Sequence, residues 1–129
     1  MSASILTSTS KKKIIVVDDN AANLTACKKT LKDLYEVYPA LSADKMFEIL
    51  THIIPDIILL DVEMPVVNGH EALRMLKENE AYKNIPVIFL SAMEDDESET
   101  EGLKLGAVDY IRKPIVSSLL IERIAVRML

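Results

Sequence analysis

The chain has 129 residues, of which 50% are apolar and 27% charged, a composition that suits one globular domain with its own core. Its net charge of −5 argues against a protein that binds nucleic acid or an anionic membrane mainly by charge. A single cysteine excludes an internal disulfide and a cysteine-based metal site, and every apolar stretch is shorter than the ~20 residues that cross a bilayer.

The first ten residues are small and polar, and three lysines, Lys11–Lys13, follow them. A secretory signal has the opposite order, with charge first and then a longer apolar core. We therefore predict a flexible tail at residues 1–11, a folded domain at 12–129, and a cytoplasmic protein without direct contact to membrane or nucleic acid.

From residue 13 onward, short β-rich runs alternate with helical segments, which is typical of βα units repeated around a parallel sheet. The predicted strands are residues 13–17, 35–40, 56–60, 86–90 and 108–111. The predicted helices cover 20–32, a segment opening at Ser42, 68–79, an acidic segment ending near Leu105, and a last segment from Ser117. Short right-handed crossovers then predict a doubly wound α/β sheet.

Three residue patterns suggest where individual elements lie. Pro39 would remove a ladder hydrogen bond, so its strand belongs at an edge of the sheet. The strand that includes 57–60 is apolar at four consecutive positions, as expected for a central strand covered on both faces. Cys27 lies on the apolar face of helix 20–32, which predicts a buried, inert thiol.

Four of the predicted strands end in polar groups suited to phosphate chemistry. Asp18 and Asp19 follow the first strand, and Asp61 follows the third. Ser91 follows the fourth, and Lys113 follows the fifth. Ligands of doubly wound sheets bind at the carboxyl ends of the strands, so these side chains should converge there. Asp61 is expected at the lip of its strand, exposed enough to react.

The residue types indicate phosphoryl chemistry with a metal. Three close carboxylates (Asp18, Asp19 and Asp61) raise one another's pKa unless a cation lies among them, and Mg²⁺ suits oxygen ligands of this kind. A carboxylate can attack a phosphoryl group to give an aspartyl phosphate. The transition state then needs a cation and a donor, which Lys113 and Ser91 offer.

The chain resembles the receiver domain of bacterial two-component response regulators, of the chemotaxis-regulator-like kind. The residues that carry the resemblance are Asp18-Asp19, Asp61 with Met64-Pro65 and Gly69, Ser91-Ala92, Tyr110, and Lys113-Pro114. It covers about residues 12–129, and the order and spacing of the motifs make it specific. The resemblance implies a flavodoxin-like fold of five parallel strands, in the order 2-1-3-4-5, flanked by five helices.

The resemblance also implies roles for the matching residues. Asp61 would accept a phosphoryl group from a sensor histidine kinase or a phosphotransfer protein. Asp18, Asp19, Asp61 and the backbone carbonyl of Glu63 would bind Mg²⁺. Lys113 would pair with the phosphoryl group, and the Lys113–Pro114 bond would be cis. Such a domain is a signalling switch rather than an enzyme, although it promotes its own phosphorylation and dephosphorylation.

The switch implied by the resemblance involves Ser91 and Tyr110. The Ser91 hydroxyl would turn toward the phosphoryl group, and the Tyr110 ring would turn inward with it. The plainer interpretation of Tyr110 is a half-buried edge aromatic with a wet hydroxyl. The face made by the acidic helix, strand 108–111 and the last helix would then control an output domain beyond Leu129 or a separate effector. The same face could also join two copies of the chain in a homodimer.

Three alternatives remain at this point. A Mg²⁺-dependent phosphatase with an aspartate nucleophile would use a second acid two residues later, where Glu63 stands. A flavodoxin-like cofactor domain would need a phosphate loop where the chain has Asp18-Asp19-Asn20, and the acids would repel a phosphate. A receiver fold that docks partners without being phosphorylated is the third.

Overall fold

The computed structural model describes residues 11–92 and 96–129, apart from the side chain of Asp96. The strands are β1 (Lys13–Val17), β2 (Glu36–Ala40), β3 (Ile57–Asp61), β4 (Val87–Ser91) and β5 (Asp109–Arg112). The helices are α2 (Ala21–Leu31), α3 (Ala43–Leu50), α4 (Gly69–Lys77), α5 (Asp96–Leu105) and α6 (Ser117–Arg127). The predicted flexible tail lies outside the described residues except for Lys11.

The five strands form one parallel sheet in the order β2-β1-β3-β4-β5, which confirms the predicted fold. Strand β2, which contains Pro39, lies at an edge, as the proline predicted. Strand β3 lies at the centre and is buried at all five positions. The prediction ended β3 and β4 one residue too early, because the parallel ladder continues through the pairs Asp61–Leu90 and Ser91–Arg112.

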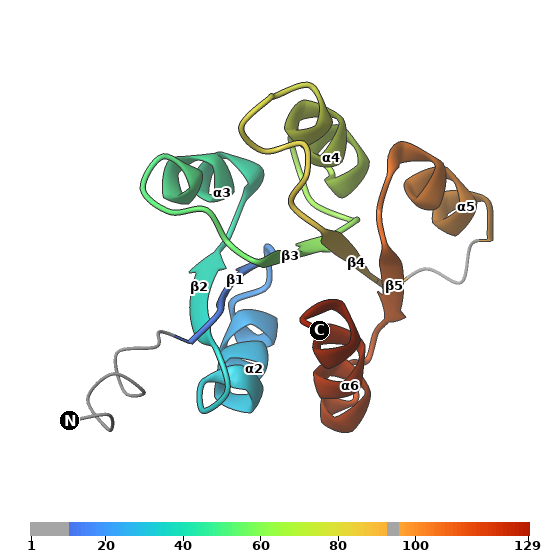
Figure 1. Cartoon of the computed structure of the whole chain (residues 1–129). Helices are drawn as coiled ribbons and strands as arrows, with labels where there is room; N and C mark the ends of the chain where they lie inside the picture. Colours follow the sequence, from blue (N-terminus) through green and yellow to red (C-terminus); the bar gives the residue numbers. More distant parts are fainter. Residues whose placement is uncertain (1–10, 93–95) are drawn as a thin grey trace.

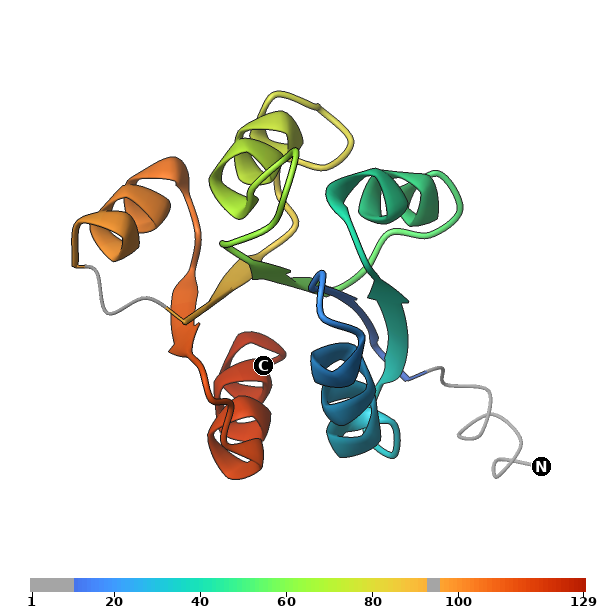
Figure 2. The ribbon, with the colours of Figure 1, turned by 180° about the vertical axis from the view of Figure 1, so that it is seen from behind.

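Helices cover both faces of the sheet. Helices α3, α4 and α5 lie on one face, and α2 and α6 lie on the other (Figure 1). Figure 2 shows the same two layers from behind. Alternate strand residues supply the two cores, so that Ile15 packs on the side of α3 and α4 while Ile14 packs on the side of α2 and α6. Because both faces are covered, the carboxyl edge of the sheet is where polar side chains can gather.

Side-chain caps fix where several helices begin. Asn20 caps α2, Ser42 caps α3, and Asn68 caps α4. The cap of α4 is a capping box, in which Glu71 accepts a hydrogen bond from the backbone N–H of Asn68 in return. None of the helices in the described part of the chain combines the length and apolarity that crossing a bilayer requires.

Candidate functional site

The candidate site lies at the carboxyl edge of the sheet, where β1, β3, β4 and β5 end. Asp61 and Ser91 are the last residues of β3 and β4. Asp18 and Asp19 follow β1, and Lys113 follows β5. All five residues named from the sequence therefore lie at one edge of the sheet, although the chain separates them widely.

Three carboxylates converge at this edge. One oxygen from each of Asp18, Asp19 and Asp61 lies within 4.8 Å of the other two. Asp18 and Asp61 are buried, with 0% and 1% exposure, whereas Asp19 is exposed. The expectation that Asp61 is exposed at the lip of its strand is wrong, because β3 continues through Asp61 and pairs it with β4.

Asp18 is held by contacts to the start of α2. The backbone N–H of Asn20 donates to its Oδ1 at 2.9 Å, and the Asn23 side-chain amide donates to its Oδ2 at 3.2 Å. The cap that begins α2 thus also orients the first carboxylate of the site. A buried acid with several hydrogen bonds has little freedom to turn away.

Lys113 bridges two of the carboxylates. Its Nζ lies 3.0 Å from Asp18 Oδ2 and 3.2 Å from Asp61 Oδ1. Its backbone N–H donates to the Ser91 carbonyl at 2.8 Å, and its peptide bond to Pro114 is cis. Burial lowers the pKa of Lys113, but its hydrogen bonds and ion pairs with the two aspartates outweigh burial and leave that pKa raised. The ammonium is therefore a fixed positive charge beside Asp61.

The pKa of the Asp61 carboxyl is shifted far from its ordinary value. Burial, followed by the charge of Asp18, raises the pKa of Asp61 from 3.8 to about 7, although Lys113 opposes both effects. One ammonium therefore does not compensate fully for two buried carboxylates. The donors are all carboxylate oxygens, which are the ligands of a hard divalent cation, so this set fits such an ion.

Gly69 allows α4 to start directly against Asp61. A Cβ at this position would lie 2.4 Å from the Asp61 carbonyl oxygen and 2.8 Å from Cα of Val62. The Gly69 N–H donates to the Val62 carbonyl at 2.9 Å, which holds the two segments together. Any larger residue would push the helix away from the end of β3.

The side chain of Glu63 is a site residue that the sequence did not reveal. The sequence suggested its backbone carbonyl as a metal ligand and its side chain only as the second acid of the phosphatase alternative. Its carboxylate accepts hydrogen bonds from the Ser91 hydroxyl at 3.0 Å and from the Ala92 backbone N–H at 3.0 Å. The sequence did carry one signal, because an acid two residues after Asp61 must lie near the Asp61 carboxylate. The contact with Ser91 and Ala92 depends on the fold, which brings the end of β4 next to Glu63.

Tyr110 is buried between β4 and α5 rather than wet at an edge. Its side chain is 8% exposed, and its hydroxyl donates to the Ser98 carbonyl at 3.1 Å. Its ring lies 5.5 Å from that of Phe89, and Phe89 in turn meets His70 edge-on at 5.2 Å. Burial raises the pKa of the Tyr110 hydroxyl, an effect that the bond to Ser98 partly opposes.

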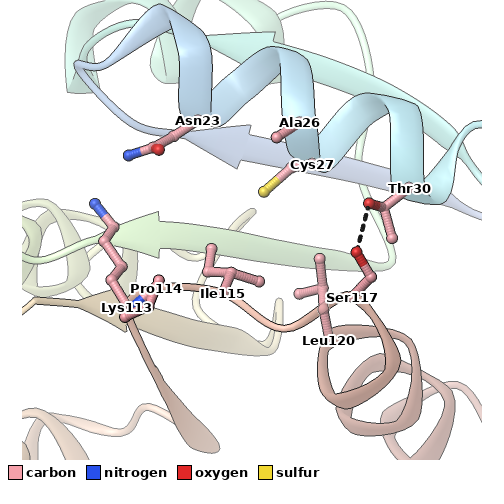
Figure 3. A pocket seen from close by; sticks show the side chains of 9 residues that line it. All are labelled: Asn23, Ala26, Cys27, Thr30, Lys113, Pro114, Ile115, Ser117 and Leu120. Carbon is pink, nitrogen blue, oxygen red and sulfur yellow. Dashed lines mark hydrogen bonds between the residues drawn. The ribbon is translucent and has the colours of Figure 1, made fainter.

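A cavity of about 240 Å³ lies between α2 and α6, with Asn23 and Lys113 at its end near the site (Figure 3). Thr30 and Ser117 join the two helices across it through their hydroxyls, 3.2 Å apart. Cys27 lines the cavity but is 3% exposed, and burial raises the pKa of its thiol to about 11. The prediction that this thiol is buried is confirmed.

A match to a known family accounts for this arrangement. Residues 14–125 match the family described as the response regulator receiver domain. The chain belongs to this family. Receiver domains are signalling switches, and this assignment decides against both the phosphatase and the flavodoxin-like cofactor domain.

The chain matches only part of the length of two curated relatives. This chain is 38% identical over 111 residues to a Vibrio cholerae protein named probable cyclic di-GMP phosphodiesterase, and the match covers 86% of this chain and 25% of that protein. It is 35% identical over 113 residues to the response regulator PleD of Caulobacter vibrioides, covering 87% and 25% respectively. The receiver thus spans about a quarter of the length of these relatives.

Solved receiver structures have the same fold. The BeF3-activated DrrB receiver domain, whose parent protein is from Thermotoga maritima, matches with a TM-score of 0.82 and 31% identity, covering 92% of this chain and 97% of that one. The chemotaxis protein CheY4 of Vibrio cholerae matches with a TM-score of 0.85 and 27% identity, covering 90% and 98%.

Proposed function

We propose that this receiver accepts a phosphoryl group on Asp61 from a sensor histidine kinase or a phosphotransfer protein. One observation supports the proposal above the others. The Asp61 carboxylate is buried at the end of the central strand, has two acidic neighbours within 4.8 Å, and has the Lys113 ammonium at 3.2 Å. A nucleophile, a place for a metal and a fixed cation are thus assembled around one oxygen.

The reaction transfers one phosphoryl group between two side chains. An Asp61 oxygen forms a bond to phosphorus as the phosphorus–nitrogen bond of the donor's phosphohistidine breaks, and the donor's imidazole leaves and keeps its proton. The product is a mixed anhydride, the aspartyl phosphate. Attack of water on the same phosphorus later releases inorganic phosphate and restores the carboxylate. The receiver promotes both steps but ends the cycle unchanged.

Asp18, Asp19, Asp61 and the backbone carbonyl of Glu63 would bind Mg²⁺. When bound, this ion supplies the positive charge that offsets the carboxylates and the phosphoryl oxygens. Lys113, which now pairs with Asp18 and Asp61, would move its ion pair to the phosphoryl oxygens. This exchange keeps the buried ammonium paired throughout the reaction.

Ser91 and Tyr110 would carry the signal outward from Asp61. The Ser91 hydroxyl would exchange its present acceptor for a phosphoryl oxygen, and the packing around Tyr110 between β4 and α5 would change with it. The affected face consists of α5, β5 and α6. We propose that it controls an output domain or a separate cytoplasmic effector, with homodimerisation through this face as one route, and without direct contact to nucleic acid or membrane.

The proposal is tested by incubating the receiver with Mg²⁺ and acetyl phosphate or beryllofluoride, beside Asp61→Asn. With acetyl phosphate we expect an adduct of one phosphoryl mass in the wild type that is absent without Mg²⁺ and absent in Asp61→Asn. The NMR signals of Tyr110 should shift with beryllofluoride in the wild type alone. A folded wild type that gives no adduct would favour a receiver that docks partners without phosphorylation.

A further inference from the structure

The Glu63 carboxylate accepts hydrogen bonds from two donors, one at the end of β4 and one directly after it. The Ser91 hydroxyl donates to its Oε2 and the Ala92 backbone N–H donates to its Oε1, both at 3.0 Å. Glu63 comes from the segment after β3, so the contact ties that segment to the end of β4. One carboxylate with one donor on each oxygen is a well-matched pair of charge-assisted hydrogen bonds.

The same donors are what a phosphoryl group on Asp61 would require. Ser91 ends the strand that pairs with β3, and Asp61 lies beside Leu90 in that ladder. Oxygens that carry negative charge at the end of β3 need donors aimed at them from the neighbouring strand. Both a carboxylate and a phosphoryl group present anionic oxygens, so Glu63 and the phosphoryl group would compete for Ser91 and Ala92.

Because Ser91 is buried, its hydroxyl would exchange the Glu63 carboxylate directly for a phosphoryl oxygen. Ser91 is 1% exposed, so its hydroxyl leaves one acceptor at little cost only if another takes its place. Glu63 is only half-buried, and its loop borders an open groove of about 500 Å³ that Asn68, His70 and Ser98 also line. The carboxylate can therefore swing from the donors into a solvated groove, whereas the donors themselves stay at the end of β4.

We propose that Glu63 is a built-in competitor of the phosphoryl group, which holds Ser91 and Ala92 in the unmodified state and so opposes phosphorylation. This inference rests on the proposed function of Asp61. Glu63 acts here through Ser91 and Ala92, and so is a positioning residue rather than a catalytic one. Its side chain has a role separate from that of its backbone carbonyl, which every substitution at this position leaves in place.

The test measures the affinity of the full chain for beryllofluoride at saturating Mg²⁺. We expect Glu63→Ala to bind about tenfold more tightly than the wild type, because the unmodified state loses charge-assisted hydrogen bonds that the adduct does not contain. Glu63→Gln, which keeps the size but loses the charge, should lie between the two. Thermal unfolding without beryllofluoride checks that each variant folds, and Glu63→Gln carries the test if Glu63→Ala does not.

Two controls separate this role from a general effect of charge. Glu48→Gln removes an acid of α3, away from the α5–β5–α6 face, whose exposed carboxylate pairs with Lys45 at 3.2 Å, and it should leave the affinity unchanged within about twofold. In a Ser91→Ala background, Glu63→Ala should gain less than about threefold, because only the Ala92 N–H is then released.

Three results would overturn the inference while leaving the proposed function intact. They are an unchanged or weaker affinity in both Glu63 variants, an equal gain in Glu48→Gln, and a full gain in the Ser91→Ala background. A wild type that binds no beryllofluoride in an Asp61-dependent way would instead overturn the proposed function, and the inference with it.

Discussion

The two flanks of Asp61 are held in different ways. One flank consists of Asp18, which follows β1, and the Lys113 ammonium, which follows β5, and ion pairs and hydrogen bonds hold both groups beside Asp61. On the side of β4, the contact is a half-buried carboxylate on a loop, Glu63, which holds Ser91. We infer that the flank with Asp18 and Lys113 is preformed for phosphoryl transfer, whereas the flank with Glu63 and Ser91 rearranges when Asp61 is phosphorylated.

The largest effect should come from removing the fixed cation. Lys113→Met leaves Asp18 and Asp61 buried without their partner, and we expect a loss of about 3–5 kcal/mol of stability in urea unfolding without metal. Arg112→Ala is the matched control, because its ion pair with Glu99 is exposed, and it should cost about 1 kcal/mol or less. Equal costs for the two variants would mean that the β1–β5 flank is no more tightly held than the surface.

Removing the charge of Asp61 should stabilise the metal-free protein at neutral pH. Its folded pKa of about 7 lies above the ordinary 3.8, so the folded protein holds this proton more tightly than the unfolded chain does. The stabilisation is complete below pH 4 and is lost as the pH rises through 7. Asp61→Asn should therefore gain stability over the wild type between pH 4 and pH 8, on the order of 3 kcal/mol.

Urea unfolding of both proteins at several pH values measures this difference. Mg²⁺ at pH 8 should stabilise the wild type and leave Asp61→Asn nearly unchanged, because the acid that repels its neighbours is also a proposed ligand. A constant difference between the two proteins from pH 4 to pH 8 would contradict the raised pKa of Asp61.

A smaller effect should follow from adding a methyl group at Gly102, beside the Phe89 and Tyr110 rings. A Cβ at Gly102 would lie 2.9 Å from the Phe89 ring and 3.0 Å from the Tyr110 ring. We expect Gly102→Ala to cost about 1–2 kcal/mol and to shift the NMR signals of Tyr110, because overpacking outweighs the better helix propensity of alanine. Thr100→Ala, at an exposed position of the same helix, should change stability by less than about 0.5 kcal/mol and leave Tyr110 in place.

The last prediction changes no residue and concerns Cys27, which lies on α2 beside the cavity that Lys113 also lines. With a pKa raised to about 11, its thiol is almost entirely protonated at pH 8 and is shielded from reagents by α2 and α6. We expect its reaction with a disulfide reagent to be at least about a hundredfold slower in the native protein than in urea. A rate close to that in urea would show that the α2–α6 side opens readily.

Much of the fold follows from local patterns in the sequence. The alternation of apolar runs and helical segments predicted all five strands and the helices between them, and Pro39 predicted the edge position of β2. These features succeed because strand burial and proline geometry act on neighbouring residues. The carboxyl end of β3 was predicted one residue too early, because the ladder that extends β3 through Asp61 depends on a partner strand about thirty residues away.

The sequence by itself identified Asp18, Asp61, Ser91 and Lys113 as groups of the site, since each stands at or near the carboxyl end of a predicted strand. Only the tertiary structure decided how those groups are held. Burial and the neighbouring Asp18 raise the pKa of Asp61, and the pairing of β3 with β4 brings the Glu63 carboxylate within reach of Ser91. Desolvation and hydrogen bonding depend on distances across strands, which residue order along the chain does not contain.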